Sequence, residues 1–327
     1  MDKQRLYRYA GPADQLYGVR RLQVQEGTAS GCSIIEAFTA GGLQADILPG
    51  ACLDIGHVRF KGQNVSYISK NGYDSPGGFS AVAGEFTHFF PGGLLYTCGL
   101  RSAGNPSEDG GEYHPQHGRI HGKQAAGISA CVEDGNLVIG GTVREASLFG
   151  HALEMRRVIT MPVWESRIVI EDTITNMAPR PEEFAILYHF NFGYPLLSES
   201  ARLVLPAKRE TTPRTEYAAS GLGKECEFSF PIDGEPEQVY FHKLDEGMAR
   251  LENAASGMAA TLRWDLASLP VLIEWKSMAS GDYVLGLEPS NNYILGRAAE
   301  RDNGTLRAIE AFGSVKTRLE LRFEALA

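Results

Sequence analysis

Short apolar or alternating runs, separated by turns that contain glycine or proline, recur along most of the chain. The last run, VKTRLELRF, alternates most regularly, with Val315, Thr317, Leu319, Leu321 and Phe323 on one face and charged residues on the other. A period of two places successive side chains on opposite faces of a strand. This run therefore predicts an antiparallel strand that is half buried and faces water on its other side.

Several neighbouring runs are joined by turn sequences and predict hairpins. Residues 33–38 and 43–48 flank an Ala-Gly-Gly turn, and residues 58–60 and 65–68 flank the sequence KGQN. In CVEDGNLVIGG, the dipeptide Asp134-Gly135 lies between two β-rich runs, which is a strong local hairpin signal.

The remaining runs continue the same pattern and indicate one all-β domain. They are LEMRRVITM, RIVIEDTITN, EEFAILYHFNFGYPLL, ARLVLP, ECEFSF and EQVYFHKL. Helical periodicity is almost absent, and only residues 78–89 and 253–260 have room for a helical turn or two. Many short strands with turns between them predict a sandwich or barrel. Because no linker or repeat divides the chain, we expect a single domain over residues 1–327, with residues 1–30 as an irregular N-terminal arm or a first strand.

Net charge, cysteine content and the lack of long apolar runs exclude several kinds of partner and site. The formal net charge of −9 argues against non-specific nucleic-acid binding, which needs a basic surface. The five cysteines are scattered and contain no CxxC pair, which predicts reduced thiols and neither a disulfide framework nor a zinc site. The N-terminus lacks an apolar signal region and no run reaches the length of a membrane span, so we expect a cytoplasmic protein.

The first segment with candidate chemistry is HGRIHG, in which His117 and His121 lie four residues apart around Arg119. On a helix this spacing would place both imidazoles on one face, as in zinc proteases, but the flanking glycines argue against a helix. In an extended segment all three side chains share one face, where the arginine would repel a metal ion. We therefore expect no metal here; the alternative is a solvated loop whose histidines are incidental.

The second segment is YHFNFGYP, in which His189 ends an apolar run and Asn191 follows on the same strand face. A buried polar pair needs partners, which favours a role facing a ligand. The alternative is a satisfied core histidine, with Asn191 capping a turn before Pro195.

The third segment is YVLGLEPSNN, in which Glu288 ends an apolar run before Pro289. The proline predicts the end of the strand ladder at this point. A carboxylate there would be partly desolvated, and the resulting rise in its pKa suits a general base near neutral pH. The alternative is a glutamate that simply reaches solvent.

With these residues in view, the chain resembles the aldose 1-epimerase (galactose mutarotase) superfamily, and within it the bacterial branch known as domain-of-unknown-function 4432. The motifs that carry the resemblance are GGLLYTCGL with QHGRI, then YHFNFGYPLL, then YVLGLEPSNN, in that order across most of the chain. The resemblance implies a large antiparallel β-supersandwich of the galactose mutarotase-like type. It also implies a small-molecule sugar as the partner and no cofactor.

The same resemblance assigns expected roles to individual residues. His117 would contact the sugar and its ring oxygen, His189 would be the general acid, and Glu288 the general base. Arg119 and Asn191 match positions typical of this branch and would contact the substrate.

Further substrate contacts are expected from His121 and from an aromatic face at Tyr194 or Trp275, although core packing is the alternative for Trp275. The chain departs from the branch at Ala51, where an arginine is expected, and at His121 and Gly122, where smaller polar residues are usual. No residue matches the aspartate that holds sugar hydroxyls in galactose mutarotases. These departures leave the identity of the sugar open.

The implied chemistry is ring opening by one acid and one base, followed by rotation and reclosure to the other anomer. Two alternatives stay open. One is a sugar isomerase or epimerase that moves a proton on carbon, which a His-Glu metal centre would favour. The other is a non-catalytic carbohydrate-binding protein, because fold does not fix function. A strand-rich protein with an exposed sheet edge also allows a homo-oligomer.

Overall fold

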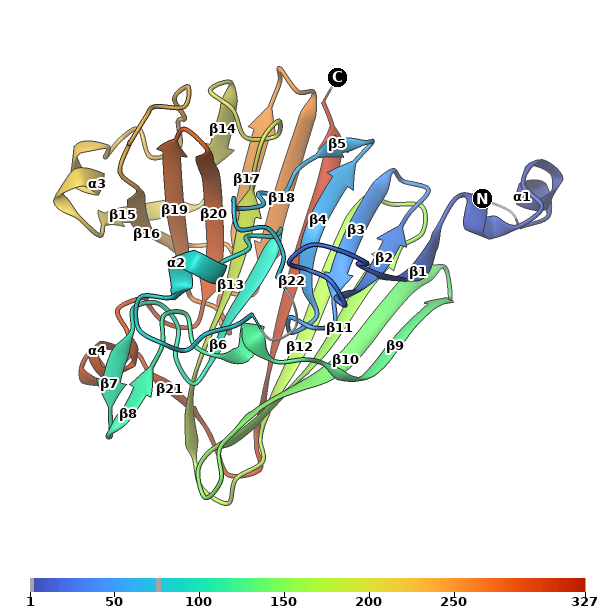
Figure 1. Ribbon diagram of the computed structural model, residues 1–327. Coiled ribbons are helices and arrows are strands. Elements are labelled where there is room, and N and C mark those ends of the chain that lie inside the picture. Colours follow the sequence, from blue (N-terminus) through green and yellow to red (C-terminus); the bar gives the residue numbers. More distant parts are fainter. Residues whose placement is uncertain (1–2, 75–77, 327) are drawn as a thin grey trace.

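The computed structural model of the chain describes residues 3–74 and 78–326. Two large sheets pack face to face as a β-sandwich, and a separate two-stranded hairpin lies beside them (Figure 1). Neighbouring strands within the sheets pair in the antiparallel sense throughout, as at β13 (Glu182–Phe192) and β20 (Asp282–Ser290). The predicted all-β antiparallel supersandwich is confirmed.

The other strands range in length from 2 residues in β5 to 12 residues in β22. The other strands are β1 Gly18–Gln23, β2 Ser33–Phe38, β3 Leu43–Leu48, β4 Asp54–Phe60, β5 Gln63–Asn64, β6 Leu95–Leu100, β7 Ser107–Asp109, β8 Glu112–His114, β9 Ala126–Glu133, β10 Asn136–Ala146, β11 Ala152–Pro162, β12 Arg167–Asn176, β14 Ala201–Val204, β15 Lys208–Pro213, β16 Gln238–Leu244, β17 Met248–Asn253, β18 Met258–Trp264, β19 Val271–Ala279, β21 Arg307–Ile309 and β22 Ser314–Ala325. The helices are α1 Lys3–Tyr9, α2 Phe86–Phe89, α3 Glu216–Ser220 and α4 Arg297–Asp302, with 3-10 turns η1 Ala13–Gln15 and η2 Ile120–Gly122.

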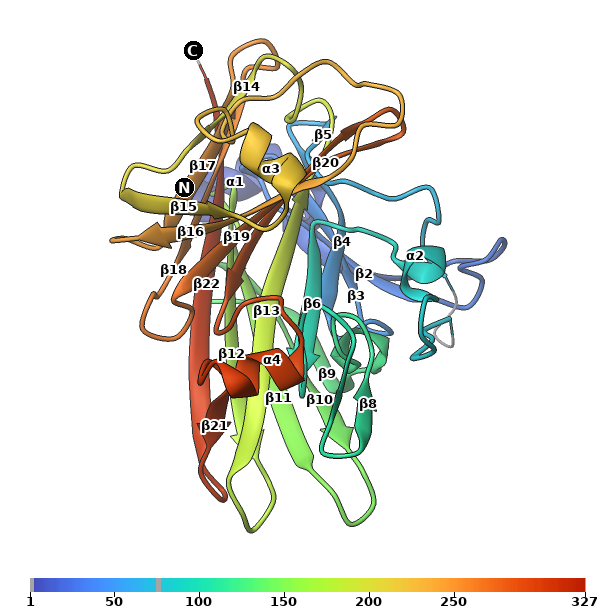
Figure 2. The same cartoon turned by 90° about the vertical axis from the view of Figure 1, so that its left-hand side faces the viewer.

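The larger sheet has 12 strands in the order β1-β2-β3-β4-β6-β13-β20-β19-β16-β15, with β5 on β4 and β21 on β13. The second sheet has eight strands in the order β14-β17-β18-β22-β12-β11-β10-β9. The helices α2, α3 and α4 and the β8 strand lie on the side of the molecule that faces the viewer in Figure 2. No helix within the described ranges is long and apolar enough to cross a bilayer.

Apolar side chains from both sheets form one continuous core between them. On β22 the predicted alternation is observed, because Leu319, Leu321 and Phe323 are buried while Arg318 and Arg322 are exposed. The Asp134-Gly135 hairpin is also confirmed. Both of its turn residues have positive φ (46° and 77°), the backbone that a two-residue hairpin turn requires.

A charged cluster lies inside this core and joins the two sheets. Arg157 of β11 is fully buried and donates to Asp172 of β12 at 2.7 Å and, across the sandwich, to Asp54 of β4 at 2.7 Å and to the Thr97 hydroxyl of β6 at 2.9 Å. The Tyr188 hydroxyl on β13 donates to Asp172 at 2.7 Å. Each buried charge is therefore paired, as burial in a low dielectric requires.

Three local predictions were wrong. Residues 65–68 form isolated bridges and no strand, because the short β5 within KGQN pairs with β4 instead. Residues 253–260 form no helix, because they comprise the end of β17, a turn over residues 254–257 and the start of β18. Residues 225–230 form no strand. Of the two alternatives for residues 1–30, the first strand is observed as the sheet-edge strand β1, and α1 and η1 precede it.

Candidate functional site

The centre of the larger sheet places a histidine and a glutamate side by side. His189 lies on β13 and Glu288 on the adjacent β20, and the register that pairs Phe190 with Leu287 sets the two directly opposite each other. His189 Nε2 lies 3.1 Å from Glu288 Oε1, and both residues are buried (5% and 2% exposed). Contrary to the prediction, β20 continues through Pro289 to Ser290, so Glu288 lies within the strand and is more fully buried than expected.

This pair forms part of the lining of a cavity of about 410 Å³. Its walls come from loops and from the strands that neighbour the pair. The lining residues are Tyr67, Ser69, Lys70, Asn71, Phe86, Thr87, Phe90, Gln116, His117, His189, Arg214, Glu237, Val239, Trp275, Asp282, Glu288 and Ile294.

His117 enters this cavity from the loop before η2, where it has a left-handed backbone (φ 59°). Its ring centroid lies 5.7 Å from that of His189. Its Nδ1 is buried without a hydrogen-bond partner among the described residues, so it is available to a ligand. The rings of Trp275 (5.3 Å) and Phe90 (5.8 Å) also pack against His189 and hold it in place.

Burial sets the charge state of the three groups. It lowers the pKa of His189 well below its usual value, and neighbouring His117 lowers it further. It lowers the pKa of His117 to about 4, with a contribution from Arg214. It raises the pKa of Glu288 well above its usual value, with a further rise from Glu237 and an opposing effect from Arg214. Burial therefore favours the neutral forms of these groups, which are the imidazole at both histidines and the carboxylic acid at Glu288.

Gly286 has no side chain and so provides the space that the His189–Glu288 pair occupies. It lies two residues before Glu288 on the same face of β20 and opposite Trp275 of β19. A Cβ atom at this position would lie 2.9 Å from Glu288 Oε1, 3.0 Å from His189 Cε1 and 3.1 Å from the Trp275 Cβ. Glycine is therefore the residue that allows both side chains to meet here.

Sequence comparison places this architecture in a family. The profile of the family described as "Domain of unknown function (DUF4432)" matches residues 29–323, which is nearly the whole chain. This chain is a DUF4432 protein. No curated protein matches the sequence.

Solved structures similar to the DUF4432 protein share its fold. A protein from Klebsiella pneumoniae described as a putative aldose 1-epimerase is 24% identical, with a TM-score of 0.82 over 93% of this chain and 83% of that chain. A galactose mutarotase-like protein from Clostridium acetobutylicum is 12% identical (TM-score 0.67, 95% and 100% covered). The galactose 1-epimerase from Lactobacillus acidophilus is also 12% identical (TM-score 0.60, 95% and 100% covered). These likenesses establish the galactose mutarotase-like fold.

Four of the expected substrate contacts of the DUF4432 protein lie outside the lining of the cavity around His189, namely Arg119, Asn191, Tyr194 and His121. Arg119 donates to the Tyr113 carbonyl at 2.6 Å and lies 3.6 Å from Glu112. Asn191 is fully buried beneath the sheet surface, where its amide donates to the carbonyls of Gly93 and His189. Tyr194 is 73% exposed.

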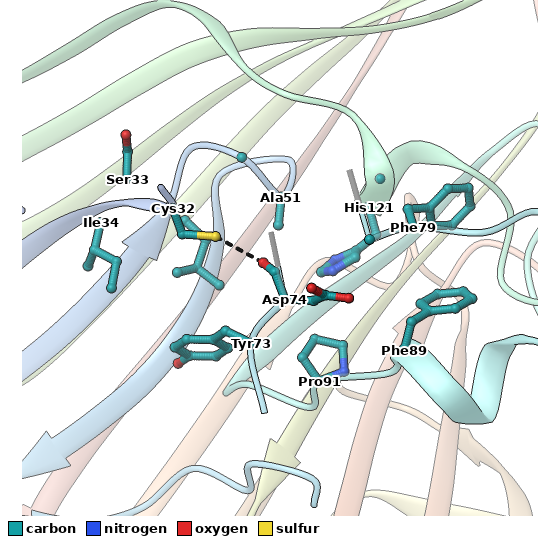
Figure 3. A pocket seen from close by; sticks show the side chains of 14 residues that line it. Cys32, Ser33, Ile34, Ala51, Tyr73, Asp74, Phe79, Phe89, Pro91 and His121 are labelled. Carbon is teal, nitrogen blue, oxygen red and sulfur yellow. Dashed lines mark hydrogen bonds between the residues drawn. The ribbon is translucent and has the colours of Figure 1, made fainter. Parts of the chain in front are cut away.

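His121 lies in a second, smaller cavity of about 80 Å³ (Figure 3). Its ring stacks on Tyr96 at 3.8 Å, and its Nδ1 lies 2.8 Å from Asp54 Oδ2. The prediction that His117, Arg119 and His121 share one face was wrong, because the left-handed His117 and the following 3-10 turn η2 replace the extended backbone that it assumed. Phe89 of α2 faces this second cavity, whereas Phe86 lines the larger one.

The rim of the larger cavity contains charged residues that sequence reasoning missed. Lys70 and Asp282 form an exposed ion pair at 2.8 Å. Arg214 donates to the Asn105 amide oxygen at 2.7 Å, and Glu237 accepts from Trp275 Nε1 at 2.7 Å. No motif marks these residues, since they lie at loop and strand ends that only the tertiary fold brings together. The described residues contain no group of three or more His, Cys, Asp or Glu side chains placed to hold a metal ion.

Proposed function

We propose that this protein is an aldose 1-epimerase that interconverts the anomers of a sugar bound in the cavity of about 410 Å³. The observation that carries the proposal is the contact of 3.1 Å between His189 Nε2 and Glu288 Oε1 in its lining. Anomer exchange needs one group that gives a proton and one that takes a proton, and this pair holds one proton between two acceptor atoms. The likeness in fold to mutarotase-like proteins supports the same activity.

In the proposed reaction the base takes the proton of the anomeric hydroxyl while the acid protonates the ring oxygen, so the ring opens to the aldehyde. Rotation about the bond next to the aldehyde carbon and reclosure, with acid and base exchanged, gives the other anomer. His117, whose Nδ1 has no described protein partner, would hydrogen-bond the ring oxygen as charge develops there.

The position of the shared proton adds one step. The family resemblance assigns the acid to His189 and the base to Glu288, but burial lowers the pKa of His189 and raises that of Glu288, which favours the proton on Glu288. We therefore expect sugar binding to move this proton across the 3.1 Å contact, as hydroxyl groups donate to Glu288 and stabilise its carboxylate.

The test is anomer exchange, measured by magnetisation-transfer NMR over a panel of free aldoses, in the wild type and in Glu288→Gln. We expect the wild type to accelerate exchange of at least one sugar and the variant to lose at least about 100-fold, the lower range for loss of a general acid-base group. Glu133→Gln, which changes an exposed carboxylate outside the cavity lining in the same way, is the matched control. No acceleration of any sugar by the wild type would contradict the proposal.

A carbohydrate-binding protein without activity is separated by the same samples. Saturation-transfer NMR reports binding independently of turnover. A sugar that binds the wild type and Glu288→Gln alike, and whose anomer exchange neither protein accelerates, would establish the binding protein in place of the enzyme.

A further inference from the structure

Glu237 is connected to the acid-base pair through one aromatic ring. It lies directly before β16, and its Oε2 accepts a hydrogen bond of 2.7 Å from Trp275 Nε1 on β19. The Trp275 ring packs edge-on against the His189 ring, with centroids 5.3 Å apart and planes at 76°. A displacement of the Trp275 indole would therefore move the His189 ring that it packs against.

The charges around Glu288 come from several elements. His189 and His117 face it, and Cys98 of β6 lies close enough for its pKa to be raised by Glu288. Lys70 and Asp282 neutralise each other at the rim. The other charged groups that act on Glu288 are Glu237 and Arg214, which carry opposite charges.

Neither of these two charges is neutralised by an ion pair among the described residues. The partner of Glu237 is the neutral indole of Trp275, and the partner of Arg214 is the neutral amide of Asn105. Both side chains line the cavity that contains the acid-base pair. Their fields therefore act on the pair with opposite signs.

We propose that Glu237 is a positioning residue for the His189–Glu288 pair: it fixes the Trp275 indole against the His189 ring, and its negative charge favours the form of the pair that retains a proton. The proposal rests on the aldose 1-epimerase function proposed above. Glu237 acts through Trp275 and through space, and no contact between it and the reacting atoms is required.

The charge of Glu237 should affect the pH dependence of the reaction. The pair is active with one proton, so it is inactivated at low pH by gain of a second proton and at high pH by loss of the first. A nearby negative charge favours both protonated forms. Removing it therefore moves both limbs of the pH–rate profile to lower pH, whereas removing a nearby positive charge moves both to higher pH.

The first experiment compares the pH dependence of anomer exchange in the wild type, Glu237→Gln and Arg214→Gln. The glutamine oxygen at 237 can still accept from the indole, so this variant removes charge and retains position. We expect both limbs to move to lower pH in Glu237→Gln and to higher pH in Arg214→Gln. Because Glu237 is exposed, solvent screens its charge and the shift is a fraction of a pH unit. Unmoved limbs in Glu237→Gln would overturn the charge part of the proposal.

The second experiment tests position with Trp275→Phe and Glu237→Ala. The first removes the indole donor while keeping an aromatic ring, and we expect a fall in kcat of about tenfold with the limbs unmoved, within the range that a displaced catalytic group costs. Glu237→Ala should combine that fall with the shift seen in Glu237→Gln. A kcat within twofold of the wild type in both Trp275→Phe and Glu237→Ala would overturn the positioning part.

A third measurement does not depend on activity, so it distinguishes failure of this inference from failure of the proposed function. In the sugar-free protein, NMR follows the Trp275 indole N–H, identified by its loss in Trp275→Phe, and the His189 imidazole, identified by its loss in His189→Gln. We expect the indole signal to move upfield in Glu237→Ala, and we expect Glu237→Gln and Arg214→Gln to shift the imidazole titration in opposite directions. If these signals respond as expected but no sugar is turned over, only the epimerase proposal fails. If the indole and imidazole signals are unchanged in every variant, Glu237 has no positioning role.

Discussion

Gly286 lies on β20 next to the His189–Glu288 pair, where a Cβ atom would come within 2.9 Å of the Glu288 carboxylate. We expect Gly286→Ala to displace Glu288 or His189 and to lower kcat for anomer exchange by about 10- to 100-fold, because catalysis is sensitive to small displacements of the reacting groups. Exchange kinetics and a thermal unfolding curve on the same sample provide the measurement.

Gly11→Ala is the matched control for that substitution, since a Cβ atom at position 11 has no atom within 4 Å. It should leave kcat unchanged. If Gly286→Ala also retained full kcat, the tight packing around the pair would have no catalytic consequence.

Among individual residues, the resemblance of three motifs was sufficient to predict His117, His189 and Glu288 as site residues, and the structure brings all three into one cavity. Their roles stay predictions until tested. Arg119 and His121 were grouped with them by assuming an extended backbone, which the left-handed residue 117 breaks. A single sequence does not reveal this, because only tertiary contacts stabilise a histidine in that conformation.

Between elements, Glu145 connects the two sheets. It lies on β10 and accepts a hydrogen bond of 2.6 Å from the Leu100 backbone N–H on β6 in the opposite sheet. Burial raises the pKa of Glu145 to about 7, against a usual value of 4.5. The folded state therefore binds a proton more tightly than the unfolded state, and the associated stability is lost as the pH rises from about 4.5 through about 7.

Glu145→Gln should therefore stabilise the protein above pH 7, because the amide oxygen can still accept from Leu100 and carries no buried charge. We expect a gain of about 1–3 kcal/mol in the free energy of unfolding at pH 8, from the size of the shift, and little difference at pH 4. Urea unfolding at both pH values is the measurement, with the exposed Glu133→Gln as a control of equal charge change. A variant less stable than the wild type at pH 8 would contradict the assignment.

The elements themselves were predictable where the side-chain pattern and the turn agreed. The bounds of β2, β3 and β12 coincide with the runs identified in the sequence. Residues 65–68 were predicted as the second strand of a hairpin across KGQN, yet Val65, Ser66 and Tyr67 are buried by tertiary contacts and the segment forms only isolated bridges. Burial and strand pairing leave the same hydrophobic signal in such a short run.

For the whole molecule, the core shared by both sheets predicts one cooperative unit, with Arg157 at its centre. Arg157→Met would leave Asp54 and Asp172 buried without their cation. We expect a loss of about 3–5 kcal/mol in the free energy of unfolding, the usual result of breaking a buried ion pair on one side. Calorimetry should show a single transition at lower temperature, in keeping with the predicted single domain.

Arg144→Met removes an arginine whose pair with Glu154 is largely exposed, and it should cost less than about 1 kcal/mol. Equal effects of the two substitutions would show that the buried cluster does not stabilise the sandwich. Two separate transitions in the wild type would contradict a single domain. The homo-oligomer stays a prediction, which sedimentation of the intact chain would test.

His189 and Glu288 lie on adjacent central strands, whereas several other polar residues of the cavity, among them His117, Asn71 and Arg214, come from the segments that connect strands. Backbone pairing fixes the distance between the proposed proton donor and acceptor, whereas the connecting segments shape the cavity proposed for the sugar. Over evolutionary time, insertions and exchanges in the connecting segments can change which sugar is accepted while the chemistry is inherited intact. Members of a family with this sheet can therefore differ in sugar specificity and still share one reaction.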